Sequence, residues 1–548
     1  MGIYLNPGKE RFQMALNSEI FVDKTEMIGC INKLINSDQR YVSVSRPRRF
    51  GKTMAADMLT AYYDSEANSR DMFANLKLAS GNETWDNYLG AFDVIRIVMT
   101  DFIKRDKDIS ASLDKMCMRI LDDLTEKYPD VKYDEDDFNY SLEKFYRHSN
   151  RQFVIIIDEW DVVFRVMKDD EDAQTLYLDF LRDWMKDKAY IALAYMTGIL
   201  PIKKYGQHSA LNMFDEYSMI QPLNLARYTA FTEEEVLELC REYGRDYNSI
   251  KDWYDGYEVS SIIPPNPERK NSKQDKADKA ICYSLYNPLS VVCAIRTGRI
   301  MNYWNKTETY EALAEYIRKD YDGLKEAVMF LMDGGRIVID TSTYENDMTT
   351  FHSKDDVLSL LIHLGYLGYD DEASEVFIPN KEILDEFKAS TKSSEWADSF
   401  KAFELSKEIL KATWDENAAK VARLLEKAHD RSANQSYNNE AALSYAIQYA
   451  YYSAQQYYTT ILELDSGKGY VDIAYLPAPK YSDKPALLIE LKYNKSAYGA
   501  ISQIKDKDYP ARLEHYKGNI LMVGINYDKD VRNDDPEFKH HSCVIEKA

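Results

Sequence analysis

Residues 41–53 constrain the fold of this chain more than any other stretch, because they predict a strand, a phosphate-binding loop and the start of a helix. The first five residues alternate apolar and small polar side chains, as in a strand entering a sheet, and the helical pattern begins at Met54. Between them, Gly51, Lys52 and Thr53 match the end of a nucleotide-binding loop. In such loops backbone N–H groups hold the phosphates, the lysine reaches the β- and γ-phosphates, and the hydroxyl binds Mg²⁺.

The loop departs from the usual motif at its beginning. Arg46 stands where a first glycine is usual, and Pro47, Arg48 and Arg49 fill the loop. This run could bring positive charge to phosphates, but it cannot adopt every backbone conformation that is open to glycine. We therefore expect Arg46, Arg48, Arg49 and Phe50 to belong to the nucleotide site. On this motif alone, an ordinary loop stays an alternative.

A second motif follows a strand that the sequence predicts to be buried. Residues 153–157 form a continuous apolar run, typical of a strand covered on both faces of a parallel sheet, and Asp158 and Glu159 follow directly. Ligands bind at the carboxyl ends of such strands. We assign Asp158 to Mg²⁺ binding through water and Glu159 to activation of the attacking water, the alternative being a merely solvated strand end. Thr197, after the next strand, could orient that water or sense the γ-phosphate; a helix cap is the alternative.

Strands and helices alternate around this loop, which predicts a three-layer α/β core of the P-loop ATPase type over residues 1–230. A mostly helical middle domain is expected over 231–393, where a hairpin at 364–379 is compatible with either a winged-helix module or a helical adaptor. Within it, the Pro-, Lys- and Asn-rich residues 259–280 predict a solvated loop. A further α/β domain is predicted over 394–548.

The last domain has its own candidate site. Asp472 lies on one predicted strand, and Glu490 and Lys492 lie two residues apart on the next, so that the latter two share a face. Two carboxylates and a lysine on adjacent strands can form a Mg²⁺ site with a cation beside it. There the metal polarises a phosphodiester and lowers the pKa of a bound water, and the lysine positions that water or stabilises charge.

Three residues outside these strands could support the second site. Glu440, on the preceding helix, could complete the metal shell, while Gln503 and Tyr509, on the following helix, could bind the scissile phosphate or its neighbour. The D-x17-E-x-K spacing is short and recurs by chance. The order of strand, turn, strand and helix around it favours the assignment.

Composition limits the partners and the compartment that we expect. The chain has 91 acidic and 69 basic residues and a net charge of −22, which argues against a broad surface for coating nucleic acid but not against a local basic groove. No stretch approaches the roughly 18 apolar residues of a membrane span, and no signal peptide is visible, so we expect a cytoplasmic protein with no membrane partner. His540 and His541 are interpreted as a solvated pair rather than as ligands.

Both sites together give the chain a family resemblance. The segments that carry it are Phe21–Thr25, Arg46–Thr53, Ile156–Glu159, Thr197–Gly198, Trp253–Tyr257, Tyr286–Pro288, Ile378–Asn380, Val471–Asp472, Ile489–Lys492 and Gln503. With them, the chain resembles the AAA-ATPase-like proteins that carry a C-terminal PD-(D/E)XK nuclease-like domain, a bacterial family in which the arginine-rich loop without its first glycine is usual. The resemblance implies ATP and Mg²⁺ at the first site and a nuclease-like centre at the second, with no settled substrate.

Three functions follow as hypotheses. The first is an ATP-dependent or ATP-gated nuclease acting on DNA, which the intact set of Asp472, Glu490 and Lys492 favours. The second is a nucleotide-dependent switch whose nuclease fold only binds a partner, which the acidic charge favours. The third, a scaffold with both sites vestigial, is the weakest. If the ATPase works as a homo-oligomeric ring, a neighbouring subunit could supply an arginine finger, while Arg48 or Arg49 could act in cis.

Overall fold

The chain divides into two compact units in a computed structural model, Met1–Leu324 with Ile337–Ala389, and Lys325–Arg336 with Ser390–Ala548. Each unit has its own sheets and core and is described by itself, while the predicted division into three domains stays a prediction. No helix among the described residues is long and apolar enough to cross a membrane. The structure describes residues 2–80, 82–105, 108–202, 211–263, 279–304, 313, 315–317, 323–391, 394–429, 440–465, 470–506, 516, 518–529 and 540–548.

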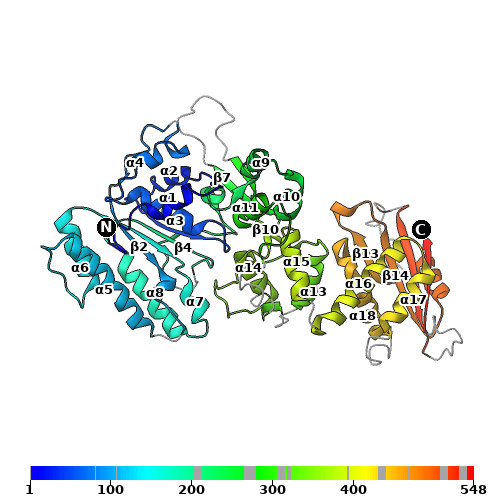
Figure 1. The fold of residues 1–548 in the computed structure, drawn as a ribbon. Helices are drawn as coiled ribbons and strands as arrows, with labels where there is room; N and C mark the ends of the chain where they lie inside the picture. The colour runs from blue at the N-terminus through cyan, green and yellow to red at the C-terminus, as the bar shows by residue number, and fades with distance from the viewer. Residues whose placement is uncertain are drawn as a thin grey trace. The chain divides into compact units, whose positions relative to one another are not determined.

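A five-stranded parallel sheet forms the centre of the first unit, in the order β2-β3-β4-β1-β5 (Figure 1). Its strands are β1 Tyr41–Ser45, β2 Asp93–Val98, β3 Phe153–Asp158, β4 Ile191–Gly198 and β5 Asp215–Tyr217. The chain leaves β1 for the far edge of the sheet and then returns strand by strand to lie beside it. Ligands of open α/β sheets bind at the carboxyl ends of strands where the strand order reverses in this way.

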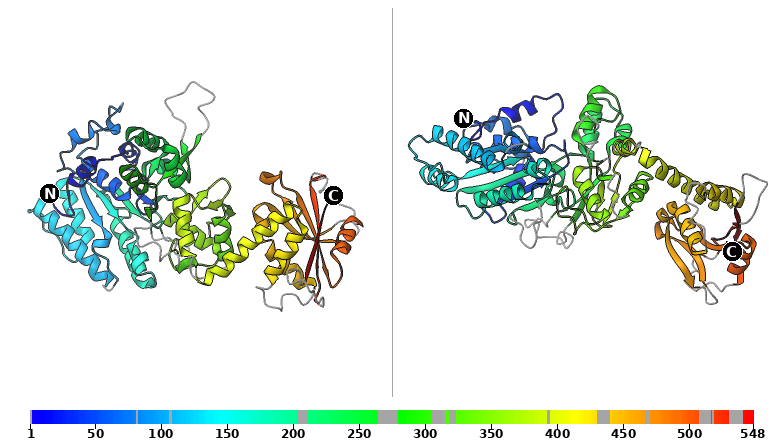
Figure 2. Two further views of the ribbon diagram at one scale, coloured as in Figure 1. Left: turned by 45° about the vertical axis from the view of Figure 1, so that its right-hand side comes forward. Right: turned by 90° about the horizontal axis from the view of Figure 1, so that it is seen from below.

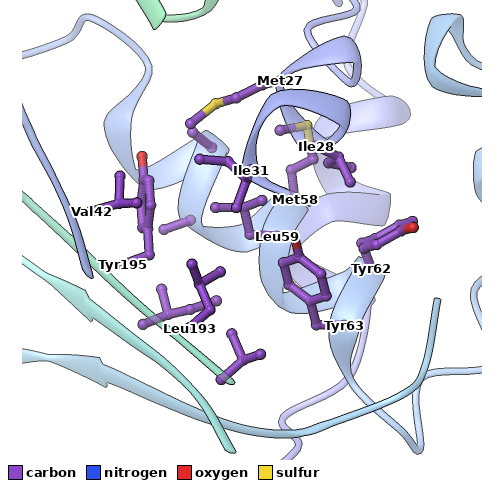
Figure 3. Close-up of a cluster of buried hydrophobic side chains, with 14 of the residues drawn as sticks. Met27, Ile28, Ile31, Val42, Met58, Leu59, Tyr62, Tyr63, Leu193 and Tyr195 are labelled. Carbon is purple, nitrogen blue, oxygen red and sulfur yellow. The ribbon is translucent and has the colours of Figure 1, made fainter. Parts of the chain in front are cut away.

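Helices cover both faces of this sheet (Figure 1). They are α1 Glu10–Leu16, α2 Glu26–Ile31, α3 Lys52–Tyr63 and α4 Arg70–Phe73 on one side, and α5 Ile109–Lys127, α6 Phe138–Ser149, α7 Val162–Val166 and α8 Glu171–Met185 on the other. Met58 and Leu59 of α3 are buried in one cluster with Val42, Leu193 and Tyr195 of the sheet (Figure 3). The predicted three-layer α/β core is confirmed, and its tight packing gives α3 a fixed position directly after β1.

The remainder of the first unit combines helices with two small antiparallel sheets, in the orders β6-β8-β7 and β10-β11-β9. The elements are β6 Phe231–Thr232, α9 Glu233–Glu242, α10 Tyr247–Tyr254, β7 Tyr257–Ile263, β8 Lys279–Tyr286, α11 Pro288–Thr297, β9 Ile337–Val338, α14 Lys354–Leu364, β10 Gly368–Asp370, β11 Glu375–Phe377 and α15 Lys381–Ser390. The predicted hairpin is β10–β11. The prediction of a loop over 259–280 is wrong at both ends, because β7 and β8 pair there and bury Tyr257 and Val259.

A buried carboxylate ties two of these helices together. Glu382 of α15 is 1% exposed, and its Oε1 accepts hydrogen bonds from the backbone amides of Tyr303 and Trp304 at 2.7 and 3.0 Å. The hydroxyl of Ser290 on α11 donates to its Oε2 at 2.8 Å. Burial raises the pKa of Glu382 to about 7, with these hydrogen bonds acting against the rise.

Replacing Glu382 with glutamine should therefore remove a pH dependence of stability. Because the folded pKa of about 7 lies above the ordinary 4.5, the contribution of Glu382 is complete below pH 4.5 and is lost as pH rises through 7. The free energy of unfolding should fall by about 3 kcal/mol over this pH range. Urea unfolding followed by tryptophan fluorescence between pH 4 and pH 8 measures it. We expect the exposed control Glu372→Gln to follow the wild type; equal pH profiles of Glu382→Gln and wild type would contradict the assignment.

The second unit is built on a mixed sheet in the order β12-β13-β14-β15-β16, parallel only between β14 and β15. Figure 2 shows α19 on one face and the yellow helices α16–α18 on the other. The elements are α13 Leu324–Met332, α16 Ser394–Trp414, α17 Ala418–His429, α18 Glu440–Ala450, β12 Tyr458–Asp465, β13 Tyr470–Pro477, β14 Ala486–Tyr493, α19 Ala497–Asp506, β15 Ile520–Tyr527 and β16 His541–Lys547. This sheet with helices on both faces confirms the predicted α/β class.

Candidate functional site: a nucleotide-binding loop and a carboxylate–lysine centre

Lys52 is the first residue of α3, and its ammonium group closes the loop that precedes the helix. Its Nζ donates to the carbonyl oxygens of Arg46 and Pro47 at 2.9 and 2.8 Å. Arg49 and Gly51 have φ angles of 68° and 86°, so the loop turns twice through the left-handed region. These turns bring the two carbonyls back over the start of α3. The lysine thus holds the loop with hydrogen bonds that oxygens of a bound phosphate could take over.

Arg46 does not present its guanidinium as free charge in the loop, which the sequence had suggested. The side chain is fully buried; Nη1 donates to the carbonyls of Ser45 and Tyr217 at 2.8 and 2.7 Å, and Nε donates to the Thr229 hydroxyl at 2.9 Å. Burial lowers the pKa of Arg46 to about 10. These contacts fasten the ends of β1 and β5 to residue 229, because a buried guanidinium requires such partners. The role of Arg46 in the structure is therefore to brace the loop.

The other predicted loop residues differ in their exposure. Arg49 and Thr53 are exposed and Arg48 is half-buried, so these three remain candidates for contact with phosphate or Mg²⁺. Phe50 is buried, and its ring packs edge-on against Tyr257 with centroids 5.2 Å apart. Its carbonyl also accepts a hydrogen bond from the amide of residue 230 at 2.9 Å. Phe50 anchors the loop rather than offering a polar group.

The predicted acidic pair lies at the carboxyl end of β3, where each member has a different cationic partner. Asp158 is 1% exposed and accepts a hydrogen bond from Nη2 of Arg96 at 3.1 Å. Glu159 has a φ of 54° and pairs with Nη2 of Arg165 at 2.7 Å. The left-handed residue turns the chain sharply after the strand, so that the two carboxylates diverge. One is held inside by β2, and the other is held at the surface by α7.

A third carboxylate, Asp161, completes the acidic end of the sheet. Its Oδ2 accepts hydrogen bonds from the amides of Ile199 and Leu200, both at 3.1 Å. Its Oδ1 and the hydroxyl of Thr197 are buried without a hydrogen-bond partner among the described residues. Unused acceptors at this edge suit the water shell of Mg²⁺, which carboxylates hold through hydrogen bonds or direct ligation. The donor set therefore fits a nucleotide with its metal.

The negative charges of these carboxylates affect the pKa of Lys52. Burial lowers the pKa of Lys52 to about 8, while the negative charges of Asp161, Asp158 and Glu159 act against that fall. The lysine and the three carboxylates therefore lie close enough to interact electrostatically. This is the arrangement that a phosphate chain with a bound cation requires, since it offers positive charge to one and negative charge to the other.

Substituting Gly198 with alanine should disturb this edge of the sheet. A Cβ there would lie 2.7 Å from Oδ1 of Asp161 and 2.8 Å from the Trp160 ring, so both must move. We expect a loss of about 1–3 kcal/mol in unfolding free energy and reduced ATP turnover. Gly29→Ala, in α2 with nothing within 4 Å of the added Cβ, is the matched control and should gain about 1 kcal/mol. Equal denaturant midpoints for the two variants would refute the steric argument.

A mainly apolar cavity of about 490 Å³ opens beside Gly51. Four segments line it, within residues 12–24, 50–58, 228–231 and 288–296, and its apolar lining includes Val22, Met58 and Leu289. The Pro288 end of α11 is fixed by Asn287, whose side chain caps the helix by accepting from the amides of residues 289 and 290. Cavities of this size and apolar character commonly bind small molecules or cofactors.

The second predicted site lies on β13 and β14 of the second unit. Lys492 Nζ donates to Glu490 Oε1 at 2.9 Å, and the two residues are only 8% and 1% exposed. The Leu491 amide donates to Asp472 Oδ2 at 2.7 Å, which fixes that carboxylate beside the next strand. Glu490 and Lys492 alternate with Leu491, which belongs to the core under α16–α18, so their side chains point to the α19 face. Two carboxylates with a buried ammonium group fit a divalent cation site.

The supporting residues predicted for this site are described only in part. Gln503 is exposed on α19, whose apolar side packs on the sheet through Ile501 and Ile504. The side chain of Glu440 and the whole of Tyr509 lie outside the described residues. Their roles stay predictions.

Comparison with protein families assigns both regions. Residues 8–207 match the family of predicted AAA-ATPases, and residues 439–537 match the PD-(D/E)XK nuclease superfamily. The chain carries an AAA-ATPase-like domain and a C-terminal PD-(D/E)XK nuclease-superfamily domain. The first match contains Lys52 and Asp158, and the second contains Asp472, Glu490 and Lys492. Domains of these kinds generally use a nucleotide and a divalent metal, respectively.

Two further likenesses are weaker. A protein of Azotobacter chroococcum mcd 1, described as an uncharacterized protein in the vnfD 5′ region, is 24% identical over 322 residues, which are 56% of this chain and 55% of that protein. The chain thus spans about half of that relative. The crystal structure of Cdc6p from Pyrobaculum aerophilum aligns over 67% of this chain and 91% of its own, with 12% identity and a TM-score of 0.23, too low to support an argument.

The AAA-ATPase-like domain also contains site residues that the sequence did not reveal. Arg96 and Arg165 bind the two predicted carboxylates, and Asp161 was given no role although it lies only two residues after Glu159. Arg96 lies 62 residues before its partner, so no local pattern marks it. Two segments of the family resemblance, Phe21–Thr25 and Tyr286–Pro288, were a usable signal, since parts of both line the cavity beside Gly51.

Proposed function

We propose that this protein is an ATP-binding and ATP-hydrolysing nuclease whose cleavage of DNA is controlled by the nucleotide. The observation that carries the proposal is the buried pair of Lys492 and Glu490 beside Asp472, in a chain that also carries the Lys52 loop. A buried ammonium and a buried carboxylate are costly to retain, and such groups gather at functional sites. A nuclease fold that only binds a partner would not need Asp472, Glu490 and Lys492 together.

At the first site, the chain's residues suit ATP. The carbonyls that Lys52 now contacts would give way to phosphate oxygens, and the exposed Thr53 hydroxyl and Asp158 would hold Mg²⁺, Asp158 through water. The apolar cavity beside Gly51 would take the base, because it opens directly at the N-terminus of α3. Glu159 would orient the attacking water once Arg165 releases it. Thr197, whose hydroxyl is unpartnered among the described residues, would sense the γ-phosphate.

At the second site, Asp472 and Glu490 would hold the divalent cation, with Glu440 as a further ligand. When bound, the metal supplies a polarised phosphodiester and a more acidic water. Lys492 would position that water and stabilise negative charge on the phosphate, since its ammonium group is already held by Glu490 at 2.9 Å. Gln503 and Tyr509 would contact the neighbouring phosphates. A cytoplasmic location and a homo-oligomeric state belong to the same proposal.

The deciding experiment is cleavage of linear, circular and single-stranded DNA with Mg²⁺ or Mn²⁺, with and without ATP. We expect cleavage by the wild type that requires the metal and changes with ATP. Clear ATP hydrolysis without cleavage of any DNA would refute the nuclease and favour a nucleotide switch whose nuclease fold only binds. If the protein neither hydrolyses ATP nor cleaves DNA, the remaining hypothesis is a scaffold in which both sites are vestigial.

A further inference from the structure

A cluster of metal-ligating side chains lies in the second unit, apart from the nuclease-like centre of that unit. Glu426 and His429 are three residues apart on the last turn of α17, and His541 is the first residue of β16. All three are buried, and one ligand atom from each lies within 4.8 Å of those from the other two. Residues three apart on a helix share a face, so the short Glu-x-x-His sequence presents two donors to the strand.

Hydrogen bonds already orient two of these side chains. Glu426 Oε2 accepts from the backbone amides of His540 and His541 at 3.1 and 3.2 Å, and lies 2.8 Å from Nδ1 of His541. A carboxylate only accepts, so His541 must carry a proton on Nδ1, and in the neutral ring Nε2 keeps its lone pair. The other oxygen of Glu426, Oε1, is buried without a hydrogen-bond partner among the described residues.

Glu426 thus has one oxygen that is already oriented by three hydrogen bonds and a second oxygen, Oε1, whose acceptor capacity is unused by the described residues in the buried space between α17 and β16. A buried acceptor in that state usually has a partner.

The cluster is distinct from the nuclease-like centre, because the two lie on opposite faces of the sheet. His541 pairs with Tyr527, which belongs to the core under α16–α18. Glu490 pairs with Gly524, whose added Cβ would meet the backbone of Ala497 in α19. A metal at one site would therefore not occupy the other.

We propose that Glu426, His429 and His541 form a Zn²⁺ site that ties the C-terminal strand to α17. Two imidazoles and one carboxylate are ligands that Zn²⁺ prefers, and a hydrogen bond that fixes the tautomer of a ligating histidine is typical of zinc sites. β16 is an edge strand, paired only with β15 within the described residues. A cation shared between α17 and β16 would hold that edge closed.

The test is zinc content of the full chain carrying Asp472→Ala, which removes metal binding at the nuclease-like centre. After dialysis against excess Zn²⁺ and then metal-free buffer, we expect one Zn²⁺ per chain. Adding His429→Gln should remove it, whereas adding His352→Gln, at an exposed histidine of the first unit, should not. Absence of zinc from the Asp472→Ala protein, or retention of zinc after His429→Gln, would overturn the proposal.

A second measurement tests the site without substituting any of its three proposed ligands. Co²⁺ bound to the Asp472→Ala chain should give the strong visible absorption of a tetrahedral site, and Zn²⁺ should slow hydrogen exchange in residues 541–547. These results would support the site even if His429→Gln does not fold. A Co²⁺ spectrum without strong visible bands, together with exchange that Zn²⁺ leaves unchanged, would refute it.

Discussion

Replacement of Lys52 by alanine is expected to lower ATP turnover by roughly 100- to 1,000-fold, the usual loss when one charge-stabilising donor is removed from an active site. The side chain is 8% exposed, and its ammonium group interacts with three carboxylates at the ends of the strands. Alanine removes the ammonium group that would contact the phosphates and takes a positive charge away from the three carboxylates. Both nucleotide affinity and turnover should fall, and the release of phosphate from ATP measures the second.

The matched control for this change is Lys33→Ala, which removes an exposed lysine that follows α2. That variant should keep wild-type turnover. Circular dichroism of Lys52→Ala checks that the loss is chemical, because the two loop carbonyls it releases can be satisfied by water. If Lys52→Ala still hydrolyses ATP at the wild-type rate while the fold is intact, the loop is not the catalytic one.

The central sheet of the first unit could be predicted from the sequence because its signals are local. The apolar run at 153–157 and the alternation at 41–45 each predict a strand without reference to any other part of the chain, and β3 and β1 lie there. The ends of the 259–280 segment were mispredicted for the opposite reason. Its polar and proline-rich composition outweighed the alternation of Tyr257 and Val259, whose burial depends on pairing with β8.

Only the residues within short sequence motifs of the candidate sites could be predicted. Gly51–Thr53, Asp158–Glu159 and Asp472 with Glu490 and Lys492 are read from short patterns, but the partners of these residues come from elsewhere in the chain. The cavity beside Gly51 requires four separate segments, and Glu426 lies 115 residues from His541. The prediction that His541 is solvated was wrong, because strand β16 carries it into the interior at 4% exposure. Such contacts follow from tertiary packing, which local periodicity does not encode.

Replacement of Lys492 by alanine is expected to lower DNA cleavage by at least about 100-fold while ATP hydrolysis by the first unit continues. The ammonium group lies 2.9 Å from Oε1 of Glu490 and forms a buried ion pair with it. Without it, a nucleophilic water loses its positioning group and developing charge on the phosphate loses its counter-charge. Cleavage of labelled linear DNA under single-turnover conditions isolates this step from product release.

Lys495→Ala is the control, because Lys495 is exposed just beyond the end of β14 and leaves the Lys492–Glu490 pair untouched. It should cleave as the wild type does, whereas Asp472→Asn should match Lys492→Ala. If Lys492→Ala and Asp472→Asn both lose DNA cleavage while Lys495→Ala retains it, the residues on the α19 face act as one centre. Cleavage that survives Lys492→Ala but fails in Asp472→Asn would assign the chemistry to the metal ligands alone. The lysine would then serve to hold the side chain of Glu490 in place through their hydrogen bond.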